Sequence, residues 1–278
     1  MTARDFRQVD VFTAEPYRGN PVAVVLDGDG LSDDQMAAFA RWTNLSETTF
    51  VTTATTDGAD YRLRIFTPGR ELPFAGHPTL GSAHAWLDSG RTPGGGDSVV
   101  QECGVGLVRL RRDGDRLAFA APELSRGGPV EAETQAKIAH ALRIDGADVR
   151  AYEWVDNGPG WVGVLLDSAD AVLGLEPDFS AFDGLKIGVV GPYQTDSECA
   201  FEVRGFAPSL SVGEDPVTGS LNAGLGQWLI GEGIAPERYV ASQGTRLQRA
   251  GRVHVERVDG QVWVGGASTT CISGQVEL

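Results

Sequence analysis

The chain has 278 residues, of which 41% are hydrophobic, and this length predicts one large domain or two medium ones. Its net charge of -15 and pI of about 4.6 argue against nucleic acid and anionic membranes as partners. No apolar run is long enough to cross a membrane, and the N-terminus lacks the basic and apolar regions of a secretory signal. We therefore expect a cytoplasmic protein.

The first half begins as a succession of strands interrupted by one helix. A capping box that opens at Ser32 starts this helix, and Asn44 is expected to end it. The alternating and β-branched segments predict four strands, over residues 9–13, 22–26, 47–53 and 61–67.

A turn-rich segment lies near the middle of the chain. Residues 122–129 are the candidate linker, and a helix is expected over residues 130–142. We accordingly predict two domains, residues 1–124 and residues 125–278, with the last strand packing back on the first half.

An internal repeat relates the two halves. Residues 61–68 (YRLRIFTP) resemble residues 201–208 (FEVRGFAP), and residues 77–82 (HPTLGS) resemble residues 215–220 (DPVTGS). The copies occur in the same order, offset by about 140 residues, which is half the chain. This pattern indicates a duplicated fold.

In each half the second motif, residues 77–82 or residues 215–220, is expected to begin a helix. Proline is favoured at the first helical position, so we expect His77 and Asp215 to be N-cap residues. Helix N-termini carry free N–H groups and partial positive charge, and two of them across a cleft would suit a carboxylate-bearing substrate. Aspartate is an ordinary N-cap, whereas histidine is not, so the histidine calls for a functional explanation. Both helices carry little charge, which predicts that each is buried within its own half's sheet.

A third candidate is Glu47, at a predicted helix-to-strand junction. On a strand it would share the inward face of Thr49, and a half-buried carboxylate can act as acid and base near neutral pH. An exposed loop acid is the alternative interpretation. Gly76 and Gly219 permit close backbone approach to a ligand, or simply relieve crowding.

No metal site or nucleotide loop is predicted. The three cysteines are far apart, the four histidines lack ligand spacing, and the glycine-rich segments lack the residues of phosphate-binding or dinucleotide-binding loops.

The same segments resemble the signature sequences of the phenazine-biosynthesis PhzF-like family. They cover essentially the whole chain and keep its motif order: Asn20-Pro21, residues 44–48 (NLSET), 76–81 (GHPTLG), 213–220 (GEDPVTGS), 242–244 (SQG) and 264–266 (VGG).

The resemblance implies an α+β protein of diaminopimelate epimerase-like fold, with two pseudo-symmetric halves, each a curved, mostly antiparallel sheet wrapped around a central helix. It implies a cofactor-free, metal-free isomerase that transfers a proton on a small carboxylated cyclic or amino-acid-like substrate, and it suggests a homodimer. By resemblance the catalytic residues are Glu47, His77 and Asp215. The substrate-binding residues are Asn20, Ser46, Gly76, Gly219 and Ser220.

The chain departs from the family pattern after Ser220, where Leu221-Asn222 replaces a small residue and a histidine. The paired cysteines of diaminopimelate epimerase are also missing at His77 and Asp215, which argues against thiol-based racemisation. Three functions remain open: the isomerisation of trans-2,3-dihydro-3-hydroxyanthranilate in phenazine biosynthesis, epimerisation or tautomerisation in another secondary-metabolite pathway, and non-catalytic binding on the same fold. Retention of Glu47, His77, Asp215 and Ser220 together argues against the last.

Overall fold

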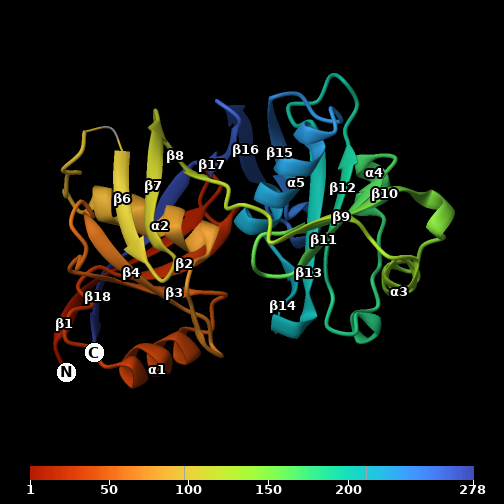
Figure 1. Ribbon diagram of the computed structural model, residues 1–278. Coiled ribbons are helices and arrows are strands. Elements are labelled where there is room, and N and C mark those ends of the chain that lie inside the picture. The colour runs from red at the N-terminus through yellow and green to blue at the C-terminus, as the bar shows by residue number, and fades with distance from the viewer. Residues whose placement is uncertain (97, 211) are drawn as a thin grey trace. The chain divides into compact units, whose positions relative to one another are not determined.

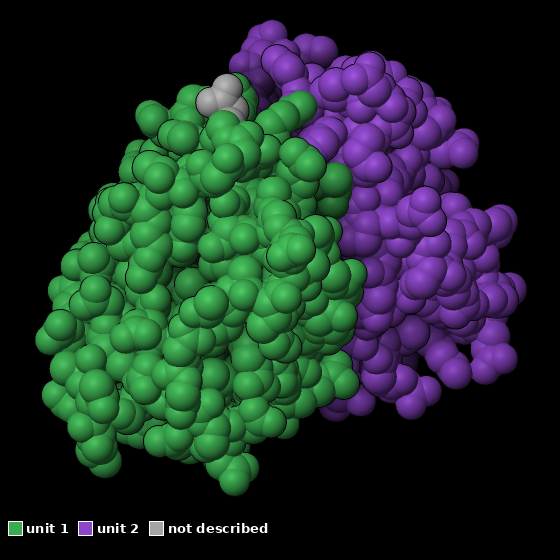
Figure 2. Space-filling view, turned by 60° about the vertical axis from the view of Figure 1, so that its left-hand side comes forward, with its two compact units in different colours: residues 1–120, 265–278 green, residues 121–264 purple. Residues whose placement is uncertain are grey.

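The structure is a computed structural model that describes residues 1–96, 98–210 and 212–278. It divides into two compact units (Figure 2). Unit 1 comprises Met1–Ala120 and Gly265–Leu278, and unit 2 comprises Ala121–Val264. In the described part of the chain, no helix is both long and apolar enough to cross a membrane.

The sheet of unit 1 is mostly antiparallel. Its first strand, β1 (Ala3–Val11), pairs with β2 on one side and with the C-terminal strand β18 on the other. The pairs β2–β3 and β4–β6 are parallel. The remaining strands are β2 (Asn20–Val25), β3 (Thr48–Thr52), β4 (Tyr61–Phe66), β5 (Glu71–Leu72), β6 (Ser98–Cys103), β7 (Gly106–Asp113), β8 (Arg116–Ala120) and β18 (Ser268–Glu277).

Two helices pack on this sheet. α1 (Asp33–Thr43) begins with the predicted capping box between Ser32 and Gln35 and ends at Asn44 in the left-handed conformation. It buries Met36, Phe39 and Ala40 against strand residues of an aromatic-rich cluster. α2 (Gly76–Asp88) is buried over nearly its whole surface and packs against β1, β2 and β8 (Figure 1).

Unit 2 repeats this topology. Its parallel pairs are β11–β12 and β13–β15, which correspond to β2–β3 and β4–β6. The strands are β9 (Arg126–Pro129), β10 (Val149–Asp156), β11 (Trp161–Leu166), β12 (Lys186–Pro192), β13 (Phe201–Ala207), β14 (Val212–Asp215), β15 (Arg238–Gln243), β16 (Gly251–Val258) and β17 (Gln261–Gly266). The helices are α3 (Ala132–Leu142), α4 (Ala169–Leu173) and α5 (Gly219–Gly231).

α5 is the counterpart of α2. Each follows a short antiparallel pair, β4–β5 or β13–β14, and each precedes the strand that pairs in parallel with the first member of that pair. α5 is likewise buried nearly all round. The predicted α+β fold with two pseudo-symmetric halves around central helices is therefore confirmed.

Two predicted segments differ in detail. The turn-rich segment 122–129 contains β9, which pairs with β10 through Gly127 and Gly128. The following helix, α3, begins at Ala132 rather than at residue 130, because Glu131 has the extended backbone of an N-cap. Turn residues marked the connection correctly, but they do not prevent a short edge strand.

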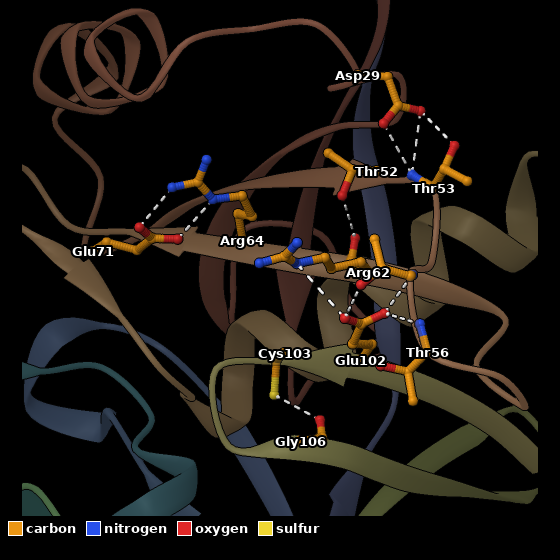
Figure 3. A network of polar contacts seen from close by, with 11 residues as sticks. Asp29, Thr52, Thr53, Thr56, Arg62, Arg64, Glu71, Glu102, Cys103 and Gly106 are labelled. Atoms are coloured by element: carbon orange, nitrogen blue, oxygen red, sulfur yellow. Dashed lines mark hydrogen bonds and ion pairs between the residues drawn. The ribbon is translucent and has the colours of Figure 1, made fainter.

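The repeated arginine braces the strand that leads into each central helix. Arg64 on β4 donates two hydrogen bonds, of 2.8 and 2.7 Å, to the carboxylate of Glu71 on β5 (Figure 3). Arg204 on β13 does the same to Glu214 on β14, at 3.0 and 2.8 Å. Each guanidinium also lies over the ring of the phenylalanine two residues further along. The Arg-x-Phe repeat thus encodes a bidentate brace.

Candidate active site

The structure brings together the predicted site residues Glu47 and His77 of unit 1. Glu47 immediately precedes β3, and His77 is the second residue of α2. Oε2 of Glu47 lies 3.5 Å from Nδ1 of His77. Their side chains are 16% and 6% exposed, so the pair is largely shielded from water.

Close packing of α2 on β2 determines where His77 lies. A Cβ atom on Gly81 would come within 2.4 Å of Cγ1 of Val22, so a glycine is required for this approach. His77 precedes Gly81 by four residues and therefore lies on the same helix face. Its ring forms a hydrogen bond with the backbone carbonyl of Pro21, in β2.

Burial determines the charge of the histidine. It lowers the pKa of His77 to about 3, although the hydrogen bond to the Pro21 carbonyl opposes the shift. The imidazole is therefore neutral near pH 7, and Glu47 faces a neutral ring rather than an imidazolium. Nε2 of His77 is buried and has no hydrogen-bond partner within the described residues. Buried polar atoms are rarely left without partners, which makes this nitrogen a candidate contact for a bound small molecule.

The turn before Asn20 is held by a buried carboxylate. Oδ2 of Asp10 accepts hydrogen bonds from the backbone N–H groups of Arg18 and Gly19, at 2.7 and 2.9 Å. Asp10 is 2% exposed, and Asn20 is completely buried as the first residue of β2. Asp10 thereby holds the entry to the strand whose Pro21 carbonyl contacts the imidazole.

The other two unit 1 candidates are chain neighbours of this pair. Ser46 lies directly before the glutamate and is partly buried. Gly76 is the buried first residue of α2, directly before the histidine. Further along α2, the hydroxyl of Ser82 bonds that of Thr49 on β3 at 2.8 Å, so this serine has a structural role.

The predicted N-cap positions of His77 and Asp215 are wrong. Ala75 is the N-cap of α2, and Thr218 is the N-cap of α5. Pro78 consequently occupies the third helical position, which it tolerates because the first four N–H groups of a helix have no intrahelical partner. Asp215 is the last residue of β14, ahead of the helix.

Asp215 is nevertheless tied to the start of α5. Its Oδ2 atom accepts a hydrogen bond from the hydroxyl of Thr218 at 2.7 Å. Its backbone carbonyl accepts another, of 3.1 Å, from the side-chain amide of Gln243 on β15. The carboxylate is thus held beside the helix start by its N-cap residue and by a neighbouring strand.

Gly219 and Ser220 are the first two residues of α5. The hydroxyl oxygen of Ser220 accepts a 3.0 Å hydrogen bond from the indole N–H of Trp161, on β11. Its backbone carbonyl accepts one from the side-chain amide of Asn157. These bonds fix the serine, and its hydroxyl proton has no acceptor among the described residues and can be donated.

Sequence patterns did not predict four of these contacts. Asp10, Asn157 and Trp161 lie in no motif, and the burial of Asp10 is known only from the structure. Gln243 lies in a signature segment, but the sequence gives no indication that it bonds the start of α5. Such contacts depend on tertiary pairing rather than on local pattern.

The chemistry offered by unit 1 is acid–base chemistry. It combines a shielded carboxylate with a neutral imidazole, a combination that can remove and return protons. No group of three or more His, Cys, Asp or Glu side chains in residues 1–96, 98–210 and 212–278 could hold a metal ion.

Comparisons with known proteins agree on one family. Residues 9–274 match the family described as phenazine biosynthesis-like protein. The chain is 40% identical to antisense-enhancing sequence 1 of Schizosaccharomyces pombe, with 99% of each chain covered. It is 31% identical to an uncharacterized isomerase of Pasteurella multocida, over 96% of this chain and 91% of that protein.

A solved structure gives the same result. The PhzF-family phenazine biosynthesis protein of Enterococcus faecalis superposes with a TM-score of 0.83 at 25% identity, with 100% of both chains covered. The chain therefore belongs to the phenazine biosynthesis-like (PhzF) family and is an enzyme of the isomerase type.

Proposed function

We propose that this enzyme moves a proton between two carbon atoms of a small carboxylated cyclic or amino-acid-like metabolite, without a cofactor. The isomerisation of trans-2,3-dihydro-3-hydroxyanthranilate, as in phenazine biosynthesis, is the named candidate reaction. The observation that carries this proposal is the shielded pair of Glu47 and a neutral His77, whose Nε2 has no hydrogen-bond partner within the described residues.

In the proposed mechanism, the carboxylate of Glu47 removes a proton from one carbon. The electron pair of that C–H bond shifts into the conjugated system of the substrate, and Glu47 returns the proton to a second carbon on the same face. Atoms and charge balance without an oxidant or reductant. The one N–H of the neutral His77 ring lies on Nδ1, which donates to the carbonyl of Pro21, so Nε2 can accept a hydrogen bond from an N–H or O–H group of the substrate.

We propose binding roles for the remaining candidates. Ser46 and Gly76 are the chain neighbours of Glu47 and His77, and Asn20 directly precedes Pro21, whose carbonyl accepts a hydrogen bond from the imidazole. Asp215 offers a carboxylate to an amino or hydroxyl group of the substrate, Ser220 offers a hydroxyl proton, and Gly219 offers backbone at the start of α5. We further propose that the enzyme works in the cytoplasm as a homodimer. Light scattering of the purified protein tests the dimer.

The test is turnover of trans-2,3-dihydro-3-hydroxyanthranilate in heavy water, followed by ultraviolet absorbance and proton NMR. Wild type is expected to shift the absorbance and to incorporate solvent deuterium. Glu47→Gln removes the base without changing side-chain size, so it should lower kcat about 100- to 10,000-fold. Glu71→Gln, which removes another unit 1 carboxylate outside the candidate site, is the matched control and should retain activity.

Three other outcomes are informative. Full activity in Glu47→Gln would overturn the proposed base. Exchange with inversion of a stereocentre and no absorbance change would identify an epimerase. Lack of turnover in wild type would refute the named substrate, and carboxylated metabolites of other shapes would then be screened by deuterium exchange.

A further inference from the structure

Gln243 is a buried amide whose hydrogen-bonding groups are used at the start of α5. It is completely buried on β15. Its Oε1 atom accepts hydrogen bonds from the backbone N–H of Thr218 at 3.0 Å and from Nδ2 of Asn222 at 2.8 Å. Its Nε2 atom donates to the carbonyl of Asp215 at 3.1 Å and to the hydroxyl oxygen of Thr218 at 3.0 Å.

The orientation of this amide follows from backbone chemistry. The N–H of Thr218 can only donate, so the Gln243 atom that faces it must be the oxygen. The carbonyl of Asp215 can only accept, so the atom that faces it must be the nitrogen. The orientation of Asn222 is fixed in the same way, because its Nδ2 also donates to the carbonyl of Thr218 at 2.9 Å.

The direction of the next hydrogen bond follows from this orientation. The hydroxyl oxygen of Thr218 receives a proton from Nε2 of Gln243, which has no lone pair to accept one in return. The single hydroxyl proton of Thr218 is therefore donated to Oδ2 of Asp215, 2.7 Å away. The aspartate oxygen is the acceptor, which favours the ionised carboxylate.

The fold leaves room for this network at a glycine. A Cβ atom on Gly205, which pairs with Asp215 across β13 and β14, would lie 3.0 Å from Oγ1 of Thr218 and 3.3 Å from Nε2 of Gln243. The network also gives a role to Asn222, which stands where the family resemblance suggested histidine. Its amide supplies the second donor to Gln243.

We propose that Gln243 is a positioning residue that, through Thr218, sets the direction of the proton at Asp215 and holds this carboxylate as an anionic hydrogen-bond acceptor. Such a group suits a substrate that presents an ammonium, amine or hydroxyl donor. The inference deepens the binding role proposed for Asp215 and rests on that proposal.

The test measures the titration of Asp215 itself, in enzyme labelled with carboxyl-13C aspartate, by NMR without substrate. The Asp215 signal is assigned by its loss in Asp215→Asn. Thr218→Val removes the donated proton at nearly constant volume, so the titration midpoint should rise by about half to one pH unit. Thr218→Ser retains the hydroxyl and should titrate as wild type does.

Gln243→Glu is the sharper variant. It replaces the donating nitrogen by an oxygen that attracts the Thr218 proton, so the Asp215 midpoint should rise at least as far as in Thr218→Val. Thr49→Val removes a buried threonine hydroxyl from unit 1 and is the matched control, expected to leave the midpoint unchanged.

Thermal unfolding of each variant confirms that it is folded at the titration temperature. An unchanged midpoint in folded Thr218→Val and Gln243→Glu would overturn the inference. Because no substrate enters the titration, this result is distinct from failure of the proposed reaction, which would show as absent turnover with the midpoints shifted as expected.

Discussion

The two units differ in where the glycines of their close helix–sheet contacts lie. In unit 1 the helix supplies the glycine: a Cβ on Gly81 would lie 2.4 Å from Val22 and 2.8 Å from Val11 of the sheet. In unit 2 both sides supply glycines: a Cβ on Gly188 of β12 would lie 2.1 Å from Cδ1 of Leu221 on α5, and a Cβ on Gly224 of α5 would lie 2.2 Å from the carbonyl oxygen of Val155 on β10. Close packing constrains the total volume at a contact, so a glycine on either the helix or the sheet can accommodate the side chain opposite it.

The repeated arginine braces differ in a second way, their burial. The side chains of Arg64 and Glu71 are 19% and 41% exposed, whereas those of Arg204 and Glu214 are 5% and 8% exposed. Arg64 completes its bonds with Asp33, an exposed residue of α1. Arg204 instead donates to two backbone carbonyls around α4. One motif thus serves as a partly solvated brace in unit 1 and as a buried one in unit 2.

The largest expected effect comes from neutralising the buried brace. Glu214→Gln leaves the charge of Arg204 buried without its counter-ion and should lower the free energy of unfolding by about 3–5 kcal/mol. Glu71→Gln removes the equivalent, partly exposed partner and should cost less than about 1 kcal/mol. Urea unfolding measures both changes, and hydrogen exchange by mass spectrometry reports which unit loses protection. Equal losses in the two variants would contradict the difference in burial.

A smaller effect is expected from filling the two close contacts. Gly81→Ala must displace valines, whose branched side chains are stiff at χ1, and should cost about 2–3 kcal/mol. Gly188→Ala meets the methyl ends of one longer leucine, which can rotate aside, and should cost about 1 kcal/mol.

Second-site variants test this explanation. Val22→Ala should restore part of the stability lost in Gly81→Ala, and Leu221→Val should do so for Gly188→Ala, because contacting residues are energetically coupled. Thermal unfolding gives the coupling. Strict additivity in both double variants would show that these close contacts are not the cause of the loss.

The sequence predicted the duplication because its evidence is local. Arg-x-Phe-x-Pro and x-Pro-x-x-Gly-Ser each recur intact, and the capping box at Ser32 and the stop at Asn44 are read from a few neighbouring residues. These features indicated a duplicated fold and gave the ends of α1, whereas the fold class came from the family resemblance. They also singled out Glu47 and His77, which the structure places 3.5 Å apart.

The first residues of α2 and α5 could not be predicted from neighbouring residues in this way. His77 and Asp215 occupy matching positions in the repeat, yet one lies inside α2 and the other ends β14. Proline is compatible with several first-turn positions, so it does not fix the N-cap. The close contacts of Gly81 and Gly188, and the bonds of Gln243, depend on partners far away in sequence.

A third difference between the units concerns a buried acid beside the parallel strand pair. In unit 1 this acid is Glu102 on β6, which lies opposite Arg62 of β4. In unit 2 it is Glu202 on β13, the strand that corresponds to β4 rather than to β6. Glu102 accepts hydrogen bonds from the hydroxyl and N–H of Thr55 and from the N–H of Thr56, which lower its pKa to about 2 (Figure 3). Burial raises the pKa of Glu202, although the hydroxyl of Tyr193 donates to it at 2.7 Å.

These opposite shifts predict opposite effects of neutralisation. Bonds to the Glu102 carboxylate stabilise the fold above its ordinary pKa of 4.5, and this contribution is lost as the pH falls toward 2. Glu102→Gln should therefore lower the free energy of unfolding at pH 7 by about 1–2 kcal/mol and flatten the acid side of the stability profile. The raised pKa of Glu202 means that stability is lost as the pH rises through it, so Glu202→Gln should leave the protein as stable at pH 7 or more so. Melting temperatures between about pH 3 and about pH 8 measure both stability profiles. If Glu202→Gln lost as much stability at pH 7 as Glu102→Gln, both acids would act as stabilising carboxylates. That result would contradict the predicted difference between the two units.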